Sequence, residues 1–326
     1  MRGCNPMLAA RTGDKRRRKR HLCTGGASRP QSEEETAMAA VADLSRPALE
    51  ALQAPFHIGT VTLRVTDLPG LTAFYRDSIG LGVIAETADA SDLGIDGEVL
   101  VRLERGATRP ASAAGLFHLA ILLPARADLA DWLAHAAAIR LPLEGASDHL
   151  VSEALYLADP EGNGIEIYRD RPRADWPRRD GAIRMATERL DLQALLAEAR
   201  GGRYAGMPAG TRMGHIHLRV GDTAAAEAFY AGALGFELMV RYPGASFLAS
   251  GGYHHHIAGN VWSSRGAGPR QPGEAGLAAF EIVARDATDL AMMRRRMLEA
   301  GGRETTTGAA IDDPWGNRLA LVPGQG

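Results

Sequence analysis

Cysteine is almost absent from this sequence. Among 326 residues the only cysteines are Cys4 and Cys23, both close to the amino terminus. Two cysteines in one terminal segment provide neither a disulfide framework nor a cysteine-rich zinc site. A chain without structural disulfides is expected in the cytoplasm.

Long apolar runs and an excess of one charge are also missing. No stretch approaches the roughly 18 to 20 apolar residues that a membrane-spanning helix requires, so we expect a soluble protein without a membrane partner. The formal net charge of −2 gives no indication of a nucleic-acid partner. The length is typical of about two domains with a sizeable core.

A basic segment lies near the start of the chain. It reads RTGDKRRRKRH from Arg11 to His21 and continues into polar residues without apolar periodicity. No apolar region follows it, which argues against a secretory signal. A nuclear signal, a transit peptide, a nucleic-acid arm and sequence upstream of a start at Met38 remain open. Because basic blocks are usually solvated tails, we predict that residues 1–55 form a disordered leader.

Two long segments of the chain match each other without gaps. They are VTLRVTDLPGLTAFYRDSIGLGVI from Val61 and IHLRVGDTAAAEAFYAGALGFELM from Ile216. Each contains a Leu-Arg-Val strand, an Asp suited to cap a helix, a Phe-Tyr pair late in that helix, and a Gly at its end. The predicted helix caps and left-handed helix ends are Asp67, Asp222, Gly80 and Gly235.

A second matching pair divides the chain into four quarters. LADPEGNGIEIY from Leu157 corresponds to IDDPWGNRLALV from Ile311, each a turn followed by a strand. Every quarter reads as a strand, an amphipathic helix, and two or three further strands. The quarters begin near Ile58, Gly115, Met213 and Gly276.

This repeat predicts an α+β fold of four βαβββ modules. We expect two paired-module domains at residues 56–170 and 213–326, with residues 171–212 as a connector that contains a helix. Pairing two such modules curls their mixed sheets around a shared cup, which is a natural place for a ligand.

Three ionisable side chains lie in strands that are otherwise apolar. They are His118 in LFHLAILL, Glu166 in GNGIEIY and His215 in GHIHLRV. Each could be a hydrogen-bonded core residue, because an unpaired charge there would be costly. The equivalent positions of the other quarters cannot ligate a metal usefully, since they hold Thr60, Ala279 and Ala320.

One cup is therefore expected to carry ligands and its counterpart to lack them, provided that the second and third quarters share a cup. Two neutral imidazoles and one carboxylate, with open positions remaining, match the facial triad of non-haem Fe(II) oxygenases. Mn(II) accepts similar ligands, and zinc is the less attractive metal for this set.

The four-quarter pattern, with HIHLRV, AFY and YLADPEGNGIEIY, resembles the vicinal oxygen chelate superfamily. The resemblance covers about Phe56 to Pro323 and implies cup-shaped mixed sheets. The superfamily includes glyoxalases, ring-cleaving dioxygenases and antibiotic-resistance binding proteins, so the fold alone does not choose the function.

A more specific resemblance lies in SDHLVSEALYLADPEGNGIE, from Ser147 to Glu166. It is similar to the signature of extradiol dioxygenases: a His, an apolar-Tyr pair, then Pro-x-Gly and a ligand Glu. The resemblance implies cleavage of a catechol-type aromatic diol by dioxygen, with Fe(II) held by His118, Glu166 and His215. By the same resemblance, His149 and Tyr156 would hydrogen-bond the substrate oxygens and the developing anion.

Three consecutive histidines, His254, His255 and His256, read as part of a strand. In the extradiol family a histidine on the corresponding strand lies beside the metal as acid–base catalyst, a role suited to a side chain with a pKa near 6.5. Alternation along a strand places His254 and His256 on one face. We therefore expect His256 to face the cup, His254 to lie near its rim, and His255 to be hydrogen-bonded behind them.

Two other functions use the same residues. In glyoxalase I the corresponding strand supplies a fourth ligand, so His118, Glu166, His215 and His256 together would suit a Zn or Ni isomerase. A metal-free binding module would instead have apolar and aromatic cup walls without metal affinity. The number of protein ligands discriminates among these functions.

Overall fold

The computed structural model of the protein describes residues 51–324. Residues 1–50 of the predicted leader therefore lie outside the described residues. Ala51 and Ala54, at its end, are buried, so ordered structure begins before residue 56. Within the described range no helix is both long and apolar enough to span a membrane.

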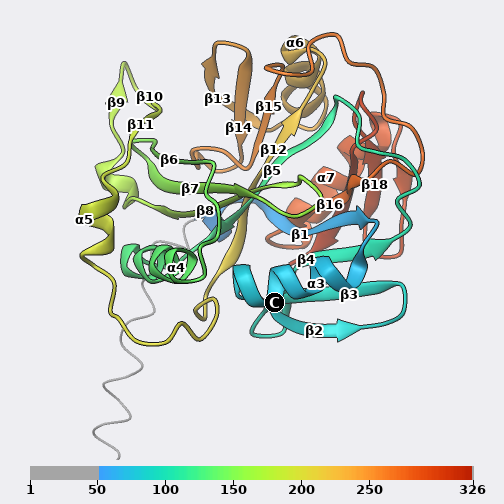
Figure 1. Ribbon diagram of the computed structural model, residues 1–326. Coiled ribbons are helices and arrows are strands. Elements are labelled where there is room, and N and C mark those ends of the chain that lie inside the picture. The colour runs from blue at the N-terminus through green and yellow to red at the C-terminus, as the bar shows by residue number, and fades with distance from the viewer. Residues whose placement is uncertain (1–50, 325–326) are drawn as a thin grey trace, which may run out of the picture. The chain divides into compact units, whose positions relative to one another are not determined.

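Two large mixed sheets form most of the described structure (Figure 1). The first sheet has eight strands in the order β17-β18-β19-β16-β1-β4-β3-β2. Its strands are β1 (Phe56–Val65), β2 (Gly82–Glu86), β3 (Ala90–Ile95), β4 (Glu98–Arg105), β16 (Gly276–Ala284), β17 (Arg303–Glu304), β18 (Ala309–Asp312) and β19 (Arg318–Pro323).

The second sheet has nine strands in the order β11-β6-β7-β8-β5-β12-β15-β14-β13. Its strands are β5 (Gly115–Leu122), β6 (Gly145–Asp148), β7 (Ser152–Ala158), β8 (Gly164–Asp170), β11 (Glu188–Arg189), β12 (Arg212–Arg219), β13 (Glu237–Tyr242), β14 (Ala245–Ala249) and β15 (Ile257–Asn260). A separate hairpin pairs β9 (Arg178–Arg179) with β10 (Ala182–Ile183).

Each large sheet joins modules from both halves of the chain. The first and fourth modules meet where β1 pairs with β16, and the second and third meet where β5 pairs with β12, both antiparallel. The α+β fold of paired βαβββ modules is as predicted, but the paired-module domains predicted at residues 56–170 and 213–326 do not correspond to the sheets. Each sheet pairs one module from either range, because the first strand of a module pairs with the first strand of a module from the other half. The second and third modules thus share one sheet, as the candidate ligands require.

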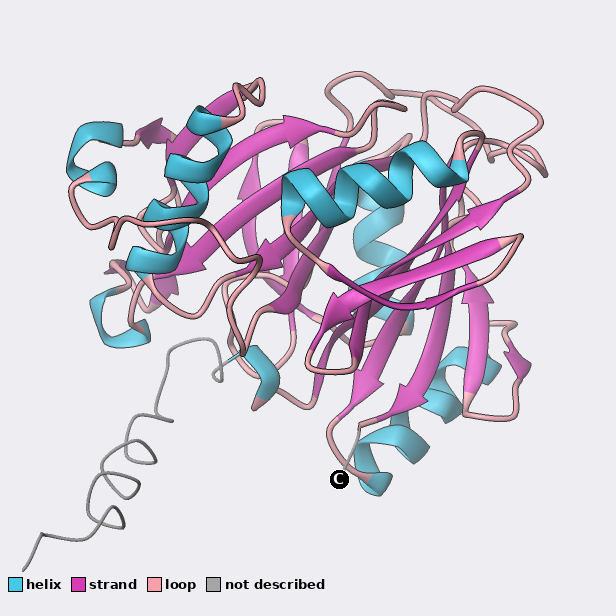
Figure 2. Cartoon of the chain, turned by 60° about the horizontal axis from the view of Figure 1, so that its bottom comes forward, coloured by secondary structure: helices cyan, strands magenta, loops and turns pink. Residues whose placement is uncertain are grey.

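Helices cover one face of each sheet (Figure 2). The eight-stranded sheet packs against α3 (Leu68–Phe74) and α7 (Ala287–Glu299), and the nine-stranded sheet against α4 (Arg126–Ala138) and α6 (Thr223–Glu227). The remaining short elements are α5 (Leu192–Leu196), η1 (Tyr75–Ile79), η2 (Arg173–Asp175) and η3 (Ala228–Ala233).

The predicted helix ends are confirmed. The carboxylate of Asp67 accepts a hydrogen bond from the backbone of Gly70, and that of Asp222 from Ala225. Gly80 and Gly235, where the helices end, have φ of 100° and 80°. Glycine adopts this left-handed conformation without the steric cost that a side chain would add.

The Asp-Pro-x-Gly-Asn turn is fastened to the Phe-Tyr motif of the helix. Buried Asp159 accepts hydrogen bonds from the backbone of Glu161 (2.9 Å) and Asn163 (2.9 Å), from the Asn163 amide (2.8 Å), and from the Tyr75 hydroxyl (3.2 Å). Asp313 repeats this arrangement with Tyr230 in the other half. In each half of the chain the Tyr of the helix thus hydrogen-bonds to the Asp of the turn. This contact explains why the helix motif and the turn motif recur together.

We expect Asp159→Ala to lower the free energy of unfolding by about 3 kcal/mol, because it leaves several buried donors without an acceptor. Urea denaturation followed by circular dichroism measures the change. Asp77→Ala is the control, since Asp77 is exposed and, among the described residues, its carboxylate pairs only with its neighbour Arg76. Equal denaturation midpoints for the two variants would contradict the role of the turn.

Candidate active site in the nine-stranded sheet

The strand register brings the three candidate ligands together. Ala120 on β5 is the register partner of both His215 on β12 and Glu166 on β8. Directly opposed residues of neighbouring strands project from the same face, and Ala120 leaves room between the two larger side chains. His118 shares this face because it lies two residues before Ala120.

The three side chains converge on one point. His118 Nε2 lies 2.9 Å from Glu166 Oε2, and His215 Nε2 lies 3.2 Å from the same oxygen. One ligand atom from each of the three residues lies within 4.8 Å of the others, and all three residues are buried. In the part of the chain that the structure describes, this is the one such group of His, Cys, Asp or Glu side chains.

The electrostatics favour a neutral His215 imidazole beside an ionised Glu166 carboxylate. Burial lowers the pKa of His215 to about 4, although the Glu166 carboxylate opposes this shift. Burial alone would raise the pKa of Glu166, but His215 and His118 hold it well below its usual value. Neutral imidazole and ionised carboxylate are the protonation states in which these groups bind metals.

A cavity of about 240 Å³ opens over this cluster. Its walls are largely apolar and aromatic, and no Lys or Arg side chain lines it. Besides His118 and Glu166, the lining comprises Phe117, Ser147, His149, Tyr156, Met185, Ala186, Thr187, His217, Val240, Tyr242, Phe247, His255 and Trp262.

His149 and Tyr156, the two residues of the signature expected to contact the substrate, lie side by side in the cavity wall. The Tyr156 hydroxyl and His149 Nε2 are 2.7 Å apart, and His149 Nδ1 lies 2.7 Å from the backbone oxygen of Ala186. Because that oxygen can only accept, Nδ1 donates and Nε2 accepts from Tyr156. Burial, together with nearby Glu166, raises the pKa of Tyr156 well above 10.

The stretch predicted as a connector contributes one wall of the cavity. Met185, Ala186 and Thr187 line it, and β11 extends the edge of the sheet beside β6. These residues were not predicted, because nothing in an irregular segment indicates which side chains turn inward. The aromatic residues from β13 to Trp262 were not predicted either, whereas the inward direction of His217 follows from its alternation with His215.

The histidine run differs from the expectation. His255, not His256, lines the cavity, and its ring centroid lies 4.1 Å from that of His215. His256 points away: its Nδ1 accepts from the backbone of Ser250 (3.1 Å) and its Nε2 faces the oxygen of Ala51 (3.4 Å). His254 is fully buried and is not at the rim.

The reason for the reversal is that the run precedes the strand. β15 begins at Ile257, so strand alternation does not extend to the three histidines. Gly251 and Gly252 adopt φ of 63° and 68°, which turns the chain before it enters the sheet. Alternation from Ala258 would have placed His256 toward the cavity.

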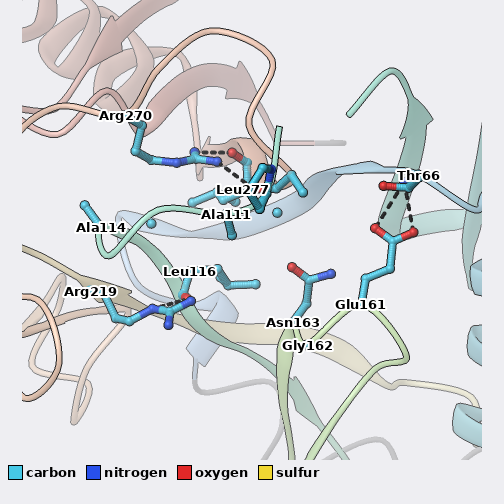
Figure 3. A pocket seen from close by; sticks show the side chains of 14 residues that line it. Thr66, Ala111, Ala114, Leu116, Glu161, Gly162, Asn163, Arg219, Arg270 and Leu277 are labelled. Carbon is cyan, nitrogen blue, oxygen red and sulfur yellow. Dashed lines mark hydrogen bonds between the residues drawn. The ribbon is translucent and has the colours of Figure 1, made fainter. Parts of the chain in front are cut away.

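A second cavity, of about 290 Å³, shares no lining residue with the first (Figure 3). No histidine lines it, and its charged side chains are bound to backbone groups. Arg219 donates to Leu116, Arg270 donates to Leu277 and Ala275, and Glu161 accepts from Thr66. Its polar groups are thus largely occupied in joining the modules.

The positions equivalent to the three candidate ligands lie in the eight-stranded sheet. Thr60 is on β1, Ala279 on β16 and Ala320 on β19. Since none of these three side chains offers an imidazole or carboxylate ligand, the two sheets have the same architecture with one metal-competent face.

A family model and known relatives agree with this architecture. The model of the Glyoxalase/Bleomycin resistance protein/Dioxygenase superfamily matches residues 57–167 and 212–321. Catechol-2,3-dioxygenase of Bacillus subtilis (strain 168) is 41% identical over 272 residues, which cover 79% of this chain and 94% of the relative.

Solved structures are similar at the level of the fold. A protein of Bacillus subtilis subsp. subtilis str. 168 aligns with a TM-score of 0.55 and 13% identity over 82% of this chain and 84% of that one. The E144Q mutant of glyoxalase I from Zea mays aligns with a TM-score of 0.52 and 16% identity over 85% and 96%. The chain therefore belongs to the Glyoxalase/Bleomycin resistance protein/Dioxygenase superfamily.

Proposed function

We propose that the protein is an extradiol dioxygenase that cleaves a catechol-type diol with dioxygen at Fe(II) held by His118, Glu166 and His215. The observation that carries this proposal is the buried cluster of these three side chains beneath an aromatic-walled cavity. The 41% identity to a catechol-2,3-dioxygenase supports an oxidoreductase of the dioxygenase type.

The residues present fit a divalent metal. His118 Nε2 is buried without a hydrogen bond, although it lies 2.9 Å from Glu166 Oε2. A buried polar atom without a partner is costly, and a cation between the three groups would satisfy it. Two imidazoles and one carboxylate suit Fe(II), and Mn(II) accepts the same ligands.

When bound, Fe(II) would supply open positions at which a chelating diol and dioxygen come together. The protein orients the diol. The aromatic walls bury its ring, while the Tyr156 hydroxyl, which already donates to His149, offers its oxygen to a substrate hydroxyl. The raised pKa of Tyr156 keeps its own proton in place.

In this proposal His255 is the histidine that moves a proton. It lines the cavity beside His215, whereas His256 is bound to backbone groups on the opposite side. A neutral imidazole can take a proton from a diol hydroxyl and return it to the ring-opened product. We therefore assign to His255 the role that the sequence suggested for His256.

The alternative functions are less well supported. A four-ligand isomerase site would need His256 beside the other three ligands, and the described residues form only a three-residue group. The likeness to glyoxalase I from Zea mays is one of fold. A metal-free binding module would not bury two imidazoles around a carboxylate.

Metal binding should depend on the cluster alone. We expect the protein to bind about one divalent ion, and Glu166→Gln or His215→Ala to weaken Fe(II) or Mn(II) binding at least about 100-fold. Anaerobic titration followed by metal analysis measures this. His149→Gln is the control, since His149 lines the cavity outside the cluster, and its metal content should stay normal. Loss of metal from the control, or its retention by Glu166→Gln, would contradict the ligand set.

Ring cleavage should require the same residues. Anaerobically purified protein loaded with Fe(II) and given catechol in air should consume dioxygen and form a yellow semialdehyde. Tyr156→Phe should keep its metal and lose activity about 10- to 1,000-fold, because the group that orients the diol is gone. If the parent protein has a normal metal content but consumes no dioxygen with any diol tested, the proposed function is wrong.

A matched pair of variants distinguishes the catalytic contributions of His255 and His256. His255→Gln should reduce kcat about 100-fold or more, whereas His256→Gln should keep a kcat close to that of the parent. Glutamine at 256 can still accept from Ser250 and donate to Ala51, so stability is also preserved. Steady-state kinetics at saturating diol measure both. The opposite ranking would restore the assignment made from strand alternation.

A further inference from the structure

A buried chain of hydrogen bonds links Asp170 to the cavity through the histidine run. Asp170 Oδ1 lies 2.8 Å from His254 Nε2, and His254 Nδ1 lies 2.8 Å from His255 Nδ1. His254 is 0% exposed, Asp170 5% and His255 6%. These contacts connect the end of β8 to the loop before β15.

The second carboxylate oxygen of Asp170, Oδ2, also accepts a hydrogen bond. The Tyr253 hydroxyl donates to Asp170 Oδ2 at 2.8 Å, and the Tyr168 and Tyr253 hydroxyls are 2.9 Å apart. Burial, followed by the nearby Asp170 charge, raises the pKa of both tyrosines well above 10, so they keep their protons. Both carboxylate oxygens of Asp170 are thus used as acceptors, Oδ2 by the Tyr253 hydroxyl and Oδ1 by His254 Nε2.

This acceptor fixes the proton positions along the chain. A neutral imidazole carries one N–H, and the carboxylate requires it on His254 Nε2. His254 Nδ1 is then the acceptor, so the proton between the two rings belongs to His255 Nδ1. The remaining nitrogen, His255 Nε2, keeps its lone pair. Among the described residues the His255 ring bonds only to His254, through Nδ1, and His255 lines the cavity.

We propose that Asp170 and His254 are positioning residues that hold His255 as its Nδ1–H tautomer, with the Nε2 lone pair reserved for the ligand in the cavity. The tautomer of His255 is inferred from the hydrogen bonds alone. Its role in catalysis rests on the proposed function. When His255 Nε2 takes a proton from a diol hydroxyl, the Nδ1–H bond to His254 is retained. No proton is gained or lost by His254 or Asp170.

The three histidines thus have separate roles. His256 ties the loop to Ser250 and Ala51, His254 transmits the orientation set by Asp170, and His255 faces the cavity. A group that holds the tautomer of a working histidine affects rate more than substrate binding, because the wrong tautomer has no lone pair for the proton.

Long-range ¹H–¹⁵N correlation spectra of the metal-free full-length protein, labelled at histidine nitrogens, test the tautomer directly. The His255 signals are assigned by their loss in His255→Gln. The expected result is a protonated Nδ1 and an unprotonated Nε2 on His255. A protonated Nε2 in the parent protein would overturn the proposal, whether or not the protein has dioxygenase activity.

Two variants of the buried network supply the comparison. Asp170→Asn should shift His255 toward the Nε2–H form, while Tyr253→Phe, which removes only the bond to the other oxygen, should leave His255 unchanged. An unchanged His255 in folded Asp170→Asn, checked by near-ultraviolet circular dichroism, would contradict the proposal. If Asp170→Asn does not fold, the parent spectrum alone decides.

Kinetics then test the consequence for catalysis. In the Fe(II)-loaded protein, Asp170→Asn should lower kcat for catechol about 10- to 100-fold with little change in KM, and Tyr253→Phe should change neither strongly. A rise in KM with unchanged kcat would contradict a positioning role. Absence of ring cleavage by the parent protein would contradict the proposed function. It would not affect the His255 tautomer, which the spectra test independently of activity.

Discussion

The buried carboxylate of Glu166 between two imidazoles is the constraint on which the rest of the site depends. A buried charge is costly unless it is paired. Glu166 is 2% exposed, and its Oε2 lies 2.9 Å from His118 Nε2 and 3.2 Å from His215 Nε2. Because the two histidines come from different modules, the pair holds together only if β5 and β12 lie side by side. The site and the pairing of the modules are thus one structural feature.

The internal repeat of this chain produces two sheets built from the same type of module but carrying different side chains at the ligand positions. Strong hydrogen bonds, such as those that join the Asp-Pro turn to the Phe-Tyr helix, occur in both halves. They stabilise each module irrespective of function. The ligand positions differ between the sheets, so the eight-stranded sheet keeps the architecture without the imidazoles and carboxylate.

The cavity combines an apolar enclosure with a small polar floor. Aromatic side chains from β5 and from the third module, including Phe117, Phe247 and Trp262, surround the metal-competent cluster. Such walls exclude water and strengthen the electrostatic interactions within. The segment between the halves completes the wall and orients His149, so residues 185–187 belong to the site as much as the strands do.

The sequence by itself determined the module repeat, the helix caps at Asp67 and Asp222, and the positions of His118, Glu166 and His215, because periodicity and hydrogen-bonding chemistry act over a few residues. It also indicated His149 and Tyr156 through the spacing of a recognisable signature, and both residues line the cavity. Tertiary structure decided which histidine of the run faces the cavity, since the chain turns at Gly251 and Gly252 before β15 and alternation no longer applies. It likewise decided that Asp170 meets His254, a contact between residues 84 positions apart that no local pattern encodes.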